Sequence, residues 1–138
     1  MSGYFCLLEE YNNIFSERMS DFMLKISNER GEIRISSAVL SNITGAAATS
    51  CFGVKGMAFR SMTDGIVHLL RREAMSKGVV ITAHDEGDIS IELHIVVEHG
   101  VNIPAVSRSI IAQVRYLVTA NTGARIRSVD VCVDSMTM

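Results

Sequence analysis

The chain has 138 residues, 48% of them hydrophobic and 20% charged, and its 15 acidic and 13 basic residues give a net charge of −2. This length suits about one domain, the apolar content excludes a disordered chain, and the charge argues against a polybasic protein of nucleic acids or membrane surfaces. No apolar run approaches the ~18 residues that a spanning helix needs. The first basic residue is Arg18, so we expect no secretory signal and a cytoplasmic protein.

The chain is predicted to open with an amphipathic extension, residues 1–30, ahead of a domain formed by residues 31–138. Apolar side chains from Tyr4 to Ile26 recur at spacings of three and four, which is typical of one helix face. We expect this helix to run as far as Met19.

A hairpin is predicted to follow. Residues 24–26 alternate between apolar and polar as a strand does, and they can pair with residues 32–35. The turn-like residues 28–31 lie between the two segments.

A second helix is predicted next, capped by Ser36 or Ser37 and running to about Cys51, with Gly53 as its stop. Its buried stripe is expected to hold Val39, Leu40, Ile43, Ala46, Ala47 and the pair Ser50 and Cys51. Residues 54–59 then resemble a short strand.

Asp64 can cap a shorter helix that ends before Gly78. Its apolar positions are Ile66, Val67, Leu69, Leu70 and Ala74.

The clearest pattern is a β-hairpin formed by residues 79–83 and 89–97. In its second strand the odd-numbered residues are apolar and the even-numbered ones largely polar, which indicates one buried and one wet face. A helix over residues 102–121 follows, with its stripe on Ile103, Val106, Ile110, Val114, Leu117 and Asn121. The last strand, residues 126–133, should bury Val129, Val131 and Val133 and carry a bulge near Arg127 and Ser128.

These elements predict an α+β domain, a two-layer sandwich in which helices cover one face of a mainly antiparallel sheet. An N-terminal amphipathic helix is expected in addition.

The strongest ionisable cluster lies on the predicted hairpin and just after it. It holds His84, Asp85, Glu86, Asp88, Glu92, His94, Glu98 and His99, with no lysine or arginine among residues 78–107. Imidazole and carboxylate together suit a divalent metal ion, but an acidic turn and a solvated strand face give the same pattern. We favour the solvated face and therefore expect no metal site.

Two features are compatible with RNA. Residues 53–56 match the Gly-x-x-Gly loop of K-homology domains, although a helix stop followed by a tight turn is favoured. The basic residues Arg108, Arg115, Arg125 and Arg127, with Arg71, Arg72 and Lys77, could form a patch, although a solvated helix face is favoured again.

The three cysteines, Cys6, Cys51 and Cys132, are far apart, and no histidine lies near Cys51 or Cys132 in the sequence. We expect ordinary thiols rather than a disulfide framework or a nucleophile. Because the common catalytic and phosphate-binding motifs are also missing, we expect neither catalytic residues nor a cofactor.

From Gly31 onward the chain resembles the alkaline shock protein family of Gram-positive bacteria, also called the envelope stress response or general stress protein family. The matching stretches are residues 31–36 with Val39 and Ile43, residues 52–57, 77–80, 91–97 and 100–103, Gln113 with Val114, residues 122–123 and residues 129–133. The chain departs from the family pattern at residues 1–30. It also departs at Thr49, Ser50, Cys51 and Phe52, where a glutamate-rich helix end is usual.

The resemblance implies a small, non-enzymatic cytoplasmic protein that associates with itself and serves cell-envelope stress response or homeostasis. It also implies a partner, either a membrane-anchor protein or an enzyme of fatty-acid synthesis, which would hold the protein at the membrane periphery. The resemblance implies no small-molecule substrate. The alternative that remains is a small RNA-binding module.

Overall fold

The computed structural model describes residues 22–60, 67–69 and 77–138, and these residues form two compact units. The first unit is Met1–Ser37 and the second is Ala38–Met138. The predicted N-terminal helix, from Tyr4 to about Met19, lies outside the described residues. The division into an extension and a domain at residue 31 stays a prediction.

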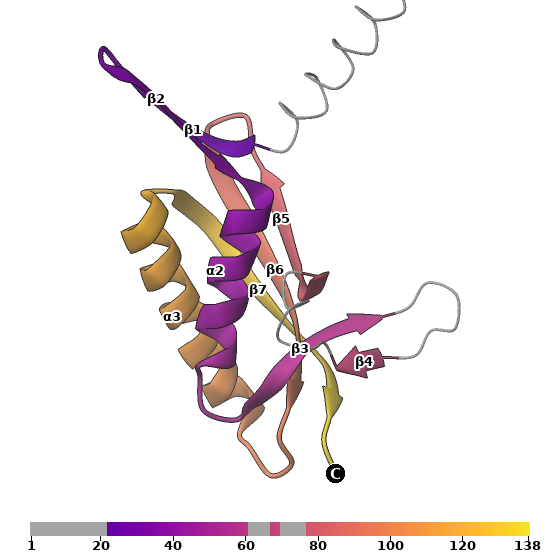
Figure 1. Ribbon diagram of the computed structural model, residues 1–138. Helices are drawn as coiled ribbons and strands as arrows, with labels where there is room; N and C mark the ends of the chain where they lie inside the picture. Colours follow the sequence, from indigo (N-terminus) through magenta and orange to yellow (C-terminus); the bar gives the residue numbers. More distant parts are fainter. Residues whose placement is uncertain (1–21, 61–66, 70–76) are drawn as a thin grey trace, which may run out of the picture. The chain divides into compact units, whose positions relative to one another are not determined.

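The first unit contains the predicted hairpin, formed by β1 (Phe22–Asn28) and β2 (Gly31–Ser36) (Figure 1). The strands pair antiparallel, with Ile26 opposite Ile33. The Asn28 side chain closes the turn, because its Oδ1 accepts hydrogen bonds from the backbone N–H groups of Arg30 and Gly31.

In the second unit, both helices lie on one side of a five-stranded sheet (Figure 1). The helices are α2 (Ser37–Thr49) and α3 (Ile103–Thr122). The strands are β3 (Val54–Arg60), β4 (Val67–Leu69), β5 (Val79–Ala83), β6 (Asp88–Val97) and β7 (Arg125–Met136). This arrangement confirms the predicted α+β class.

Strand β6 is the centre of the sheet. It pairs antiparallel with β5 through its first half and with β3 near its end, and it pairs parallel with β7 along its whole length. Along β6 the buried residues are Ile89, Ile91, Leu93, Ile95, Val96 and Val97. The alternation that predicted one covered face is therefore confirmed.

One predicted helix is wrong where the structure describes it. The expected helix from Asp64 to Ala74 includes residues 67–69, which form β4 and pair antiparallel with β3, with Ala58 opposite Leu69. A strand of three residues is too short to show the alternation of apolar and polar residues that identifies a strand. Its conformation is decided instead by the hydrogen bonds that its partner β3 supplies. The rest of that segment lies outside the described residues.

The buried face of α2 also differs from the prediction. Leu40 and Ala47 are buried as expected, but Val39 is 46% exposed and Ala46 is also exposed. Ser41, Thr44, Gly45 and Ala48 are buried instead. Small side chains let the helix axis approach its neighbours, and the Thr44 hydroxyl is satisfied by donating to the Leu40 carbonyl at 2.7 Å.

Helix α3 has both predicted ends. Asn102 caps its first turn, since its side chain accepts from the Ala105 N–H, and Gly123 ends it in the left-handed conformation. The buried residues are Val106, Ile110, Val114, Val118 and Thr122. Val118 and Thr122 therefore take the places expected for Leu117 and Asn121, because every step of the stripe is four residues.

The final strand confirms the predicted bulge. Its register with β6 shifts between Ile126 and Ser128, and a second shift follows between Val133 and Ser135. Of the three valines expected inside, Val129 is buried, while Val131 and Val133 are half-buried. No helix in the described part of the chain is both long and apolar enough to cross a membrane.

Candidate functional site

The densest group of potential ligands lies on β6 and β7, on the sheet face that α2 and α3 leave uncovered. Glu92 and His94 alternate with the buried residues of β6, so their side chains point away from the core. The parallel pairing places Cys132 opposite His94. Glu92, His94 and Cys132 each offer a ligand atom, and these three atoms lie within 4.8 Å of one another.

His94 has a carboxylate at each ring nitrogen. Its Nε2 lies 2.7 Å from Glu92 Oε1, and its Nδ1 lies 2.9 Å from Asp134 Oδ2. The Asp134 side chain is only 16% exposed and that of His94 is 29% exposed, whereas that of Glu92 is 47% exposed. The imidazole is therefore held on its Nδ1 side by a well-covered partner and on its Nε2 side by one open to solvent.

The environment of Cys132 is negative. Burial raises the pKa of its thiol, and the carboxylates of Glu92, Asp134 and Asp130 raise that pKa further. The thiol consequently keeps its proton where no cation is close. Burial also raises the pKa of the Cys51 thiol, against a smaller opposite effect of Ser109.

The structure brings together only part of the predicted ionisable cluster. Glu92 and His94 meet, whereas His84 Nε2 instead contacts the Ser90 hydroxyl at 2.6 Å. Asp85, Glu98 and His99 are exposed. No local sequence pattern indicates Cys132 and Asp134 as neighbours of His94, because they reach it through the parallel pairing of β6 with β7, which α3 separates in the chain.

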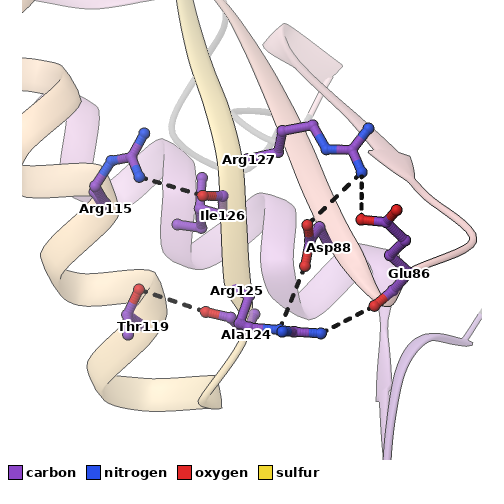
Figure 2. A network of polar contacts seen from close by, with 8 residues as sticks. All are labelled: Glu86, Asp88, Arg115, Thr119, Ala124, Arg125, Ile126 and Arg127. Carbon is purple, nitrogen blue, oxygen red and sulfur yellow. Dashed lines mark hydrogen bonds and ion pairs between the residues drawn. The ribbon is translucent and has the colours of Figure 1, made fainter.

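Two residues of the predicted basic patch, Arg125 and Arg127, pair with acidic residues of the β5–β6 hairpin (Figure 2). The predicted patch residues Arg71 and Arg72 lie outside the described residues. Arg125 Nε lies 3.3 Å from Asp88 Oδ1, and Arg127 reaches Glu86 Oε2 at 3.3 Å. Arg115 donates to the Ile126 carbonyl at 3.2 Å. These contacts tie the hairpin and α3 to β7, whereas Lys77 and Arg108 are exposed.

The Gly-x-x-Gly segment joins α2 to β3 rather than two helices. Gly53 has φ of 88°, and a Cβ added there would meet Val106 Cγ2 at 3.0 Å and Val101 Cγ1 at 3.1 Å. This is the helix stop and close turn that the sequence favoured.

An open apolar groove of about 810 Å³ runs along the C-terminal half of α3 and the start of β7. Its lining is Ala112, Arg115, Tyr116, Thr119, Ala120 and residues 123–126. Tyr116 is 69% exposed. Exposed apolar surface of this kind is common where one protein docks on another.

Comparison with known proteins places this architecture in a family. The model of the alkaline shock protein 23 family, which has a cell envelope-related function, matches residues 25–138. YloU of Bacillus subtilis (strain 168) is 32% identical over 114 residues, covering 82% of this chain and 94% of YloU. Spy1614 of Streptococcus pyogenes serotype M6 is 36% identical over 114 residues, covering 82% of this chain and 93% of that protein. Among solved structures, MamM-CTD is similar with a TM-score of 0.43 and 18% identity, covering 70% of this chain and 94% of that one.

Proposed function

The chain belongs to the alkaline shock protein 23 family, a family with a cell envelope-related function, and from this premise we propose that it acts as a self-associating scaffold. It works by binding proteins rather than by catalysing a reaction. Its binding partners are copies of itself and a protein of the envelope machinery, either a membrane anchor or an enzyme of fatty-acid synthesis. It acts from the cytoplasm, at the membrane periphery.

The observation that carries this proposal is the groove beside α3. Its alanines and the ring of Tyr116 offer apolar area in a concave surface that is open to solvent. Tyrosine is favoured at protein interfaces because its ring adds apolar contact while its hydroxyl keeps a polar partner. A second copy that covers Tyr116 would remove the one aromatic ring of α3, which is 69% exposed, from water.

Self-association is tested by light scattering on the purified chain over a range of concentrations. We expect assemblies that grow with concentration, and we expect Tyr116→Glu to shift them to monomer because a buried carboxylate without a partner is costly. Phe52→Glu is the matched control, since Phe52 is 88% exposed, lies in the turn that leads into β3 and does not line the groove. A wild-type chain that stays monomeric, or a Tyr116→Glu variant that assembles as well as the control, would contradict the proposal.

The envelope partner is tested by mild crosslinking in the native cell at native level, with membrane and cytosolic fractions analysed separately. Enrichment of an integral membrane protein or a lipid-synthesis enzyme, lost with Tyr116→Glu and kept with Phe52→Glu, supports the scaffold. RNA that co-purifies and is released at higher salt would support the alternative instead.

A further inference from the structure

His94 has a carboxylate oxygen at each of its two ring nitrogens, which is more acceptors than a neutral imidazole has protons to donate. A neutral imidazole carries one N–H, whereas Glu92 and Asp134 each present a carboxylate oxygen within 3 Å of a ring nitrogen. Among the ion pairs of the described residues, Glu92 and Asp134 pair only with His94. Two carboxylates therefore share one ring that offers at most a single positive charge.

The thiol adds a third class of donor to the same spot. Cys132 Sγ belongs to the group of ligand atoms that spans 4.8 Å with Glu92 and His94. A carboxylate oxygen, an imidazole nitrogen and a sulfur together are typical of zinc-type ions, whereas calcium and magnesium prefer oxygen alone.

We propose that Glu92, His94 and Cys132 form a binding site for a divalent transition metal ion of the zinc type, with Asp134 as the positioning residue of His94. Nothing in the cell envelope-related function of the family assigns a metal to these residues. The ion binds Nε2 on the side of the ring that faces Glu92, where it takes the place of the contact between Nε2 and Glu92 Oε1. Binding releases the thiol proton to solvent, and the thiolate sulfur becomes the third ligand.

Asp134 has the position that metal sites commonly use to orient a histidine. A histidine that binds a metal through one nitrogen usually donates its other N–H to a carboxylate, which fixes the tautomer and the ring. Here Nδ1 lies 2.9 Å from Asp134 Oδ2, so the tautomer with its proton on Nδ1 can donate to Asp134 and keep the lone pair of Nε2 for the ion.

The spacing of the donors is compatible with zinc after small side-chain movements. Bonds of about 2.0–2.3 Å to nitrogen, oxygen and sulfur put tetrahedral ligands roughly 3.3–3.7 Å apart. The ligand atoms now lie within 4.8 Å, and Glu92 Oε1 must move away from Nε2, with which it is in hydrogen-bond contact at 2.7 Å. Glu92 is the most exposed of the three charged side chains, so this movement meets little packing. Water completes the coordination.

The test uses the untagged full chain, kept reduced by a phosphine that does not bind metal. Zn²⁺ is titrated against a competing chelator to obtain stoichiometry and affinity. Co²⁺ is then added as a probe, because a thiolate ligand gives cobalt a charge-transfer band in the near ultraviolet. We expect one ion per chain and this band in the wild-type protein.

Variants separate a built site from adventitious binding. His94→Ala and Cys132→Ser should each lose the charge-transfer band and most of the affinity. Asp134→Asn should keep the band but bind about 10–100-fold more weakly, as outer-shell changes do. His99→Ala and Cys51→Ser are matched controls, since His99 is exposed beyond β6 and Cys51 bonds to the end of α2.

The proposal is overturned if the wild-type chain shows no thiolate band. It is also overturned if the two control variants lose the ion as His94→Ala does. Thermal melting with and without Zn²⁺ adds a readout independent of the probe. The ion should raise the midpoint of the wild-type chain and leave that of Cys132→Ser unchanged, because only a chain that binds the ion when folded is stabilised by it.

Discussion

At the scale of single residues, two glycines with nearly the same positive φ allow the effect of packing on stability to be separated from that of backbone strain. Gly53 has φ of 88° and Gly100 has φ of 84°, but an added Cβ meets two valines at Gly53 and nothing within 4 Å at Gly100. We expect Gly100→Ala to lower the free energy of unfolding by about 1 kcal/mol through strain alone. Gly53→Ala should lower it by about 2–3 kcal/mol, because overpacking against Val101 and Val106 is added.

Denaturant unfolding of the two glycine variants under the same conditions measures this difference. Equal losses would show that the valines move aside without cost.

The candidate site also depends on single residues that the sequence could not connect. Glu92 and His94 were visible as neighbours on one strand face, whereas Cys132 and Asp134 reach them only through long-range pairing of β6 with β7.

At the scale of elements, the N-cap of α3 is the simplest interaction to test. Asn102 Oδ1 accepts from the Ala105 N–H at 3.1 Å, one of the four amide groups that a helix start leaves without a partner. Asn102→Ala should cost about 1 kcal/mol of stability, and Asn102→Asp should restore it. Asn121→Ala, an exposed change in the last turn, is the control and should be neutral within about 0.5 kcal/mol in the same urea titration.

The contact between the β5–β6 hairpin and β7 is a second element-scale case. Arg127 pairs with Glu86 and with Asp88, but the Arg127 and Glu86 side chains are 44% and 78% exposed. A double-mutant cycle on Arg127→Ala and Glu86→Ala should give a coupling of about 0.2–1 kcal/mol that fades at high salt. A coupling unchanged by salt would contradict this expectation.

Elements with a long repeating pattern were predictable and short ones were not. The ten-residue alternation of β6 and the capping residues of α3 identify these two elements from local sequence alone, without knowledge of the segments they pack against. β4 has three residues and takes its conformation from β3, so its sequence predicts a helix wrongly. On α2 the small residues Gly45 and Ala48 are buried and the more apolar Val39 is exposed. A pattern of apolar residues does not predict this face, because side-chain size rather than hydropathy decides which residues are buried.

At the scale of the whole molecule, stability should reside in the second unit. Among the side chains whose burial the structure describes, from Leu24 onward, every buried apolar one lies between Leu40 and Val129, whereas Ile33 in β2 is 55% exposed. Since apolar burial drives folding, a chain that lacks residues 1–36 should keep a cooperative thermal transition, with a midpoint within about 5 °C of the full chain. Leu93→Ala is the comparison, because the cavity left at this fully buried position should lower the free energy of unfolding by about 2–5 kcal/mol. A truncated chain that melts as early as Leu93→Ala, followed by circular dichroism, would place part of the folding energy in residues 1–36.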